Sequence, residues 1–213
     1  MSALIIFDID GTLLETERVT VPAVQRTFAA HGLPVPDHDT ICGFFGKPVE
    51  TYEAWLAEQC PPGMAPQIVA ETNALELRLI GCEGRLYDGA RDVLEELHAK
   101  YVLAVCSNGP DDYVNEFLDA HDVRKYLAAA RARGTRYSGK TEMIAEIKAM
   151  DLGRPIIVIG DRHDDIEAAH ANGALAVGAA YGFSGPGGDE LGGADARISS
   201  IGELPAVIAR LTG

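Results

Sequence analysis

The sequence has few positive charges and no long run of apolar residues. Its 18 lysine and arginine residues face 32 aspartate and glutamate residues, which gives a formal net charge of −14 at pH 7. Because lysine and arginine supply the affinity for a phosphate backbone, this balance argues against a general nucleic-acid binder. No stretch of about 18 apolar residues is present that could span a bilayer, so we expect no membrane insertion.

The sequence also shows no pattern of a secretory leader and no cysteine framework. The first apolar run meets a charge at Asp8 and has no basic residues before it, unlike a signal peptide, so we expect a cytoplasmic protein. The 4 cysteines form no CxxC pair, which favours reduced, packed thiols over a disulfide framework or a zinc site. They are Cys42, Cys60, Cys82 and Cys106.

The 213 residues, 47% of them hydrophobic, are enough for one large domain or for a domain with a smaller insert. Short runs rich in Ile, Val and Leu predict strands that are buried on both faces, as parallel sheets require. These runs lie at residues 4–7, 101–106, 156–159 and 174–177, with a weaker one at 127–130. Helical patterns cover residues 89–100, 111–120, 140–150, 164–172 and 201–211, and a glycine-rich surface loop is expected at 182–193. The alternation predicts an α/β fold with a doubly wound (Rossmann-like) parallel sheet.

One segment between the first two predicted strands breaks this alternation. Helical patterns, with no convincing strand, cover residues 21–31, 48–58 and 66–79. An all-helical stretch of this length is too long for a single crossover connection. We therefore predict an inserted helical cap domain at residues 16–82, with residues 1–15 and 83–213 forming the core domain.

Polar and charged residues follow the predicted strands. In open α/β sheets, ligands bind outside the carboxyl ends of the strands, so these side chains should converge on one rim. They are Asp8, Asp10, Ser107, Asn108, Asp161 and Asp165, joined by Lys140 at the start of a helix. Crowded carboxylates stay ionised only beside a compensating cation. A few carboxylates, completed by water and phosphate oxygens, favour Mg²⁺.

A metal of this kind in turn favours a phosphorylated ligand. Lys140 supplies a point charge for phosphate, while Ser107 and the backbone N–H groups near Asn108 supply neutral donors. Asp8 can then attack phosphorus, as carboxylates do in aspartyl-phosphate enzymes. The expected ligand is a small phosphorylated metabolite.

Residues 7–13, which read Phe-Asp-Ile-Asp-Gly-Thr-Leu, resemble the DxDGT nucleophile motif of the haloacid dehalogenase superfamily. Ser107-Asn108, Lys140 and residues 160–165 stand where the second, third and fourth motifs of that superfamily are expected. Four motifs in order are far more specific than any one of them. The resemblance covers nearly the whole chain, and its closest form is similar to the phosphoglycolate-phosphatase-like branch with a helical cap after the first motif.

The resemblance implies a role for each matched aspartate. Asp8 would be the nucleophile that becomes an aspartyl phosphate, and Asp10 would protonate the leaving oxygen and then deprotonate the hydrolytic water. Mg²⁺ would be held by the Asp8 carboxylate, the Asp10 backbone carbonyl and Asp161. Asp165 would support the metal shell or coordinate through water.

The resemblance also implies the phosphate-binding residues. Ser107 and Lys140 would clamp the phosphoryl group in the transition state, and Asn108 would have a mostly positional role. Two positions depart from the family pattern: Glu15-Thr16 replaces a frequent Asp-Ser or Asp-Thr pair, and Arg162 replaces a frequent Ser or Thr. The Arg162 variant is similar to a subgroup in which glycolate-phosphatase and nucleotidase assignments are both common.

Residues 43–47 of the predicted cap read Gly-Phe-Phe-Gly-Lys and resemble the cap loop that faces the active site in related enzymes. In that role, Lys47 would meet the non-reacting end of the substrate, and Phe44 or Phe45 would meet an apolar or ring portion. The alternative is that the two aromatic residues anchor the loop to the cap and Lys47 is solvated.

The leading hypothesis is a Mg²⁺-dependent phosphatase for a phosphoglycolate-, sugar-phosphate- or nucleotide-like substrate. A haloacid dehalogenase attacks carbon and needs no second aspartate as an acid, so Asp10 argues against that reaction. A phosphonate-cleaving relative would need a Schiff-base lysine in the cap, where Lys47 is the only lysine. A phosphosugar mutase and a non-catalytic regulatory protein on the same fold stay open as alternatives, as does the oligomeric state.

Overall fold

The computed structural model describes residues 2–184 and 189–213. Its described strands form a six-stranded parallel sheet in the order β3-β2-β1-β4-β5-β6, which confirms the predicted doubly wound fold. The strands are β1 (Leu4–Phe7), β2 (Val102–Ser107), β3 (Leu127–Ala132), β4 (Ile156–Gly160), β5 (Leu175–Ala179) and β6 (Ala196–Ile198). The sequence analysis missed β6, because its three residues include the exposed Arg197 and form no apolar run.

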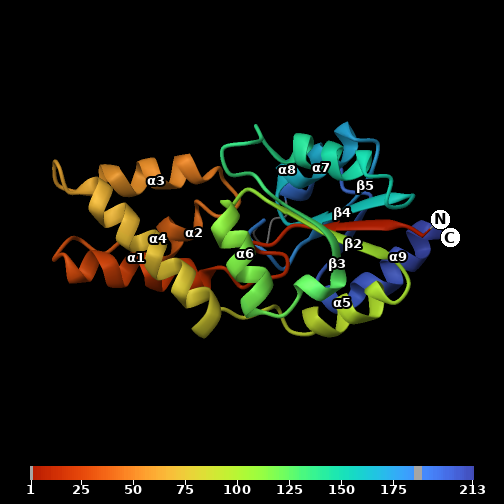
Figure 1. Cartoon of the computed structure of the whole chain (residues 1–213), viewed down its shortest axis with the longest axis horizontal. Coiled ribbons are helices and arrows are strands. Elements are labelled where there is room, and N and C mark those ends of the chain that lie inside the picture. The colour runs from red at the N-terminus through yellow and green to blue at the C-terminus, as the bar shows by residue number, and fades with distance from the viewer. Residues whose placement is uncertain (1, 185–188) are drawn as a thin grey trace.

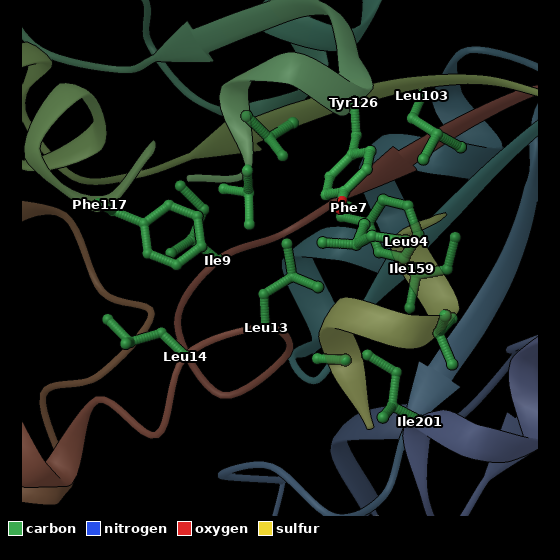
Figure 2. Close-up of a cluster of buried hydrophobic side chains, with 14 of the residues drawn as sticks. Phe7, Ile9, Leu13, Leu14, Leu94, Leu103, Phe117, Tyr126, Ile159 and Ile201 are labelled. Atoms are coloured by element: carbon green, nitrogen blue, oxygen red, sulfur yellow. The ribbon is translucent and has the colours of Figure 1, made fainter. Parts of the chain in front are cut away.

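Successive residues of the central strands point into two separate hydrophobic clusters, one on each face of the sheet. In β1, Ile5 and Phe7 join the first cluster, whereas Leu4 and Ile6 join the second. All four side chains are fully buried, because the sheet is covered on both faces. Figure 2 shows part of the first cluster, where Phe7 lies beside Leu94 of a covering helix.

Five helices of the core cover the two faces of this sheet (Figure 1). The first cluster includes side chains of α5 (Ala90–His98), α6 (Asp111–Ala120) and α9 (Leu204–Thr212). The second cluster includes side chains of α7 (Lys140–Ala149) and α8 (His163–Ala171). Short 3₁₀ helices lie at Arg124–Tyr126, Asp189–Leu191 and Ile201–Glu203. The expected loop at 182–193 includes residues 185–188, which lie outside the described residues.

Four consecutive helices gather at the end of the molecule that is far from the two chain termini (Figure 1). They are α1 (Glu17–Ala30), α2 (His38–Cys42), α3 (Val49–Glu58) and α4 (Ala65–Cys82). Their buried apolar residues, such as Phe28, Leu56 and Ile68, form a third hydrophobic cluster. The five-residue α2 was not predicted. The predicted helix at 21–31 starts four residues after the true start of α1, and Pro22 therefore lies inside α1 and not near its start. The division into a cap at 16–82 and a core stays a prediction.

No helix within residues 2–184 or 189–213 has the length and apolar character that a membrane crossing requires.

The packing of β1 generates a stability prediction. Replacing the fully buried Ile6 by alanine removes apolar surface from the second cluster and leaves a cavity, so we expect Ile6→Ala to lower the free energy of unfolding by about 2–5 kcal/mol. Urea denaturation followed by circular dichroism measures this loss. Val35→Ala, at a side chain that is 49% exposed, is the control and should change the free energy of unfolding by less than about 0.5 kcal/mol. Equal effects of the two substitutions would contradict the packing described here.

Candidate active site

Three neighbouring strands bring polar side chains to one edge of the sheet. Phe7, the last residue of β1, pairs with Val105 of β2 and with Ile159 of β4. The next residue, Asp8, continues the ladder by donating its N–H to the Ile159 carbonyl at 2.8 Å. The strand order runs outward in both directions from β1 and β4, so the adjacent carboxyl ends of these strands form the crevice in which doubly wound sheets bind ligands.

The turn after β1 needs a glycine for two reasons. Gly11 has a φ of +72°, in the left-handed region that residues with a Cβ rarely adopt. A Cβ at this position would also overlap the carboxylate of Asp161. The Asp-Gly-Thr part of the first motif therefore lets the turn come close to the acidic group at the end of β4.

Three buried carboxylates meet at this edge, as the sequence predicted. Asp8, Asp161 and Asp165 each place one oxygen within 4.8 Å of the others, and each residue is at most 1% exposed. Two of the oxygens, Asp8 Oδ2 and Asp161 Oδ1, are buried without a hydrogen-bond partner in the described part of the chain. Buried acceptors of this kind are rare in proteins unless a water or an ion satisfies them. The arrangement therefore fits a hard cation.

Lys140 is the positive charge that faces this cluster. Its Nζ atom lies 3.1 Å from Asp8 Oδ1 and 2.6 Å from Asp165 Oδ1, and its side chain is 1% exposed. Asp165 also accepts the backbone N–H of Arg162 through its Oδ2 atom, which caps the start of α8. Both oxygens of Asp165 thus have protein donors, in contrast to the free oxygens of Asp8 and Asp161.

Burial and mutual repulsion shift the pKa values of this cluster. Burial raises the pKa of Asp8 well above its ordinary value, against the attraction of Lys140. Burial, together with repulsion from Asp165, raises the pKa of Asp161 to about 7. Burial also raises the pKa of Asp165 to about 6, although Lys140 opposes this shift. Burial disfavours the charge on Lys140, but Asp165 and Asp8 outweigh it and hold the Lys140 pKa well above its ordinary value.

The carboxylate of Asp10 is held separately by three hydroxyl groups. Its Oδ1 atom accepts hydrogen bonds from Thr16 Oγ1 at 2.8 Å and from Tyr113 Oη at 2.6 Å. Its Oδ2 atom accepts a longer bond of 3.3 Å from Ser107 Oγ. Asp10 is partly exposed and lines a cavity of about 110 Å³ together with Asp8. The two aspartates of the first motif therefore have different surroundings.

The cavity lies between the core and the four-helix segment. The predicted loop residues Phe44, Phe45 and Lys47 all line it, opposite Asp8 and Lys140. Phe44 stacks on Trp55 with ring centroids 4.5 Å apart, and the Lys47 Nζ atom lies 4.8 Å from the centre of the Phe44 ring.

Phe45 is only 5% exposed and belongs to the third hydrophobic cluster. Its ring packs edge-on against Phe183, in the segment that follows β5. The three loop residues thus face the cavity and also make anchoring contacts.

Two polar contacts tie this loop region to the core. Asn108 donates through Nδ2 to the Gly46 carbonyl at 3.0 Å and to Asp164 Oδ2 at 2.9 Å. Arg133 forms an ion pair of 2.6 Å with Glu50 of α3. Asn108, which the sequence placed at a strand end with a positional role, therefore contacts the helical segment directly.

Two hydroxyl partners of Asp10, those of Thr16 and Tyr113, were not among the predicted site residues. Thr16 appeared in the sequence analysis only as part of a departure from the family pattern, and Tyr113 was one residue of a predicted helix. The spacing of Ser107 and Tyr113 gave a usable signal, because the first turns of α6 follow β2 directly and must lie beside the same strand end. The contact itself needed the fold.

Comparisons with known proteins agree with this geometry. A family model described as haloacid dehalogenase-like hydrolase matches residues 5–179. The chain is 25% identical to a phosphoglycolate phosphatase of Vibrio parahaemolyticus, over 97% of this chain and 96% of the relative. It is 28% identical to a phosphoglycolate phosphatase of Cupriavidus necator, over 96% of this chain and 92% of the relative. A solved haloacid dehalogenase-like hydrolase from Streptococcus pneumoniae has the same fold, with a TM-score of 0.82, 24% identity and 98% of each chain covered.

The raised pKa values generate a prediction about stability in the absence of metal. Between about pH 4 and pH 7 the folded protein keeps a proton on Asp161 that the unfolded chain has released. The raised pKa of Asp161 therefore lowers the free energy of unfolding progressively as the pH rises through this range. Asp161→Asn cannot ionise, and we expect it to stabilise the protein in EDTA by about 1–3 kcal/mol more at pH 8 than at pH 4. Urea denaturation at both pH values measures the difference.

The control is Val35→Ala, at an exposed apolar residue that cannot ionise. It should give the same small change in the free energy of unfolding at both pH values. A gain from Asp161→Asn that is no larger at pH 8 than at pH 4 would rule out the raised pKa.

Proposed function

This chain belongs to the haloacid dehalogenase-like hydrolase family, and from that premise we propose that it is a Mg²⁺-dependent phosphatase for small phosphomonoesters. The observation that carries the proposal is the pair of buried oxygens on Asp8 and Asp161 that have no hydrogen-bond partner within residues 2–184 and 189–213, set beside the buried Lys140. This grouping can hold a hard cation and a phosphoryl group together. The similarity to phosphoglycolate phosphatases supports the same reaction class.

The residues at the strand ends fit a magnesium ion. We assign its ligands to the Asp8 carboxylate, the Asp10 backbone carbonyl and Asp161, all of which offer the hard oxygens that this ion prefers. A bound Mg²⁺ would neutralise negative charge and polarise the phosphate oxygens. Asp165 completes the acidic cluster, and because both its oxygens accept protein donors, its main task in this proposal is to orient Lys140.

In the proposed reaction, a carboxylate oxygen of Asp8 attacks phosphorus and the bond to the leaving oxygen breaks. Asp10 donates a proton to that oxygen, which leaves as an alcohol. Asp10 then takes a proton from the water that attacks the aspartyl phosphate, so that inorganic phosphate is released and both aspartates return to their starting forms. The partial exposure of Asp10 to the cavity suits a group that exchanges protons twice in each cycle.

The phosphoryl group needs donors that do not move during the reaction. Lys140 supplies a fixed positive charge, since two carboxylates hold its Nζ atom in place. Ser107 supplies a hydroxyl at the end of β2, and it already contacts the Asp10 carboxylate. Asn108 positions the cap loop over this site through its bond to Gly46. Phe44, Phe45 and Lys47 are the proposed contacts for the leaving group.

Removal of the metal, the nucleophile or the acid should each abolish or slow the proposed reaction. Phosphate release from p-nitrophenyl phosphate, 2-phosphoglycolate, sugar phosphates and nucleoside monophosphates should require Mg²⁺ and stop in EDTA. Asp8→Asn should show no turnover above background, because an amide is not a nucleophile here. Asp10→Asn should lower kcat by about 10²- to 10⁴-fold, the usual contribution of a general acid and base.

Turnover by Asp8→Asn within about tenfold of the wild type would refute the aspartyl-phosphate mechanism. Transfer of phosphate to a second sugar hydroxyl, in place of water, would instead indicate the mutase reaction. Circular dichroism of each variant checks that loss of activity does not reflect unfolding.

The Tyr113 hydroxyl, which donates a hydrogen bond to Asp10, can be removed without removing the ring. Tyr113→Phe keeps the buried ring but removes the 2.6 Å hydrogen bond to the Asp10 carboxylate. We expect kcat to fall by about 10- to 100-fold with little change in KM, since one charge-assisted hydrogen bond contributes about 1.5–3 kcal/mol. Tyr101→Phe, whose hydroxyl contacts Thr212 instead, is the matched control and should keep wild-type kcat. A Tyr113→Phe enzyme that changes KM alone would show that this tyrosine does not act through Asp10.

A further inference from the structure

We propose that the cap side of the cavity selects a leaving group that carries hydroxyl or amine donors and rejects one that carries a carboxylate. This inference rests on the proposed phosphatase function and names the substrate class for the same site. Its central residue is Glu76, on α4, which lines the cavity together with Asp8 and Asp10. The sequence analysis did not single out this glutamate.

The side chain of Glu76 is placed as an acceptor that faces the cavity. Its Oε1 atom accepts a hydrogen bond from Thr20 of α1, and Thr20 lines the same cavity. No hydrogen bond to Oε2 is found among the described residues, and this atom is not fully buried. A ligand donor in the cavity can therefore bind the second oxygen. Asn73, one turn before Glu76, adds a further polar group to this side of the cavity.

The balance of charge in the cavity lining opposes a second negative charge on the substrate. Four acidic residues line the cavity, namely Asp8, Asp10, Glu76 and Asp112. The two lining lysines are Lys140, which is already paired with Asp8 and Asp165, and Lys47. A carboxylate beside Glu76 would meet like charge, and like charges in a partly buried site repel strongly. Lys47, the other lining lysine, has its Nζ atom over the Phe44 ring.

The protonation state of Glu76 affects only the repulsive part of this selection. Burial raises the pKa of Glu76 to about 7, with the Thr20 hydrogen bond acting against the shift and Asp10 adding to it. The neutral and the ionised forms both offer an acceptor oxygen to a donor, whereas the ionised form, which dominates above about pH 7, supplies the repulsion of a carboxylate.

The size of the cavity points to a small leaving group. Its volume of about 110 Å³ is well below the roughly 300–1,000 Å³ of typical pockets for larger ligands. Phe44, Tyr52 and Leu77 supply apolar walls around the acidic groups. A short polyol or amino alcohol fits this combination better than a nucleoside does.

The wild-type enzyme with Mg²⁺ provides the first test, which needs no variant. We expect kcat/KM for glycerol 3-phosphate or O-phosphoethanolamine to exceed kcat/KM for 2-phosphoglycolate by at least about tenfold. The comparison of the first two esters shows whether hydroxyl or amine donors are preferred. A higher kcat/KM for 2-phosphoglycolate would overturn the inference while leaving the phosphatase function intact. No metal-dependent release from any ester, including p-nitrophenyl phosphate, would overturn both.

A matched pair of variants tests whether Glu76 is the residue responsible. Glu76→Gln keeps the shape of the side chain and removes its charge, so the preference for donor-bearing esters over 2-phosphoglycolate should fall by about tenfold. Glu71→Gln makes the same change on the same helix, at an exposed residue that contacts His31 and Gln67 outside the cavity. It should keep the wild-type preference. An unchanged preference in a folded Glu76→Gln protein would overturn the assignment.

Discussion

Repulsion among three buried carboxylates is the constraint around which the functional end of this protein is built. Asp8, Asp161 and Asp165 are brought within a few ångströms by adjacent strand ends and the following helix, where water cannot screen them. Lys140 offsets part of the charge and is itself kept protonated by the same carboxylates. The remaining negative charge, and the oxygens of Asp8 and Asp161 that find no partner among the described residues, make this edge of the sheet suited to a cation. Burial of apolar side chains in the two hydrophobic clusters on the sheet offsets the energetic cost of this repulsion.

The same strand ends also determine how the helical segment meets the core. Asn108 follows β2 and binds the carbonyl of Gly46, and Arg133 follows β3 and pairs with Glu50. The loop that carries Phe44 and Lys47 is thereby placed over Asp8 and Lys140. In the proposed phosphatase, chemistry and selectivity thus come from different parts of the chain: the strand ends would supply the reacting groups, and the helical segment would supply the cavity wall.

Much of the fold could be predicted because its signals are local. Buried parallel strands need continuous apolar residues, so runs such as Leu4–Phe7 were visible in the sequence, whereas the short β6 with its exposed Arg197 was not. Helix starts were less reliable: α1 begins at Glu17, before the proline that was expected near its start. The acidic cluster could be predicted because a parallel sheet brings the residues after its strands to one edge.

The sequence by itself was enough to predict that Asp8, Asp161, Asp165 and Lys140 lie together, since each follows or precedes a predictable element, and their role as a reaction centre belongs to the proposed function. Only the tertiary structure decided which groups surround that centre. Tyr113 reaches Asp10 across 103 positions of sequence, and Glu76 of α4 lines the same cavity as Asp8 after β1. These contacts depend on how α4 and α6 pack against their neighbours, and that packing follows from the summed shape of many side chains and leaves no local pattern in the sequence.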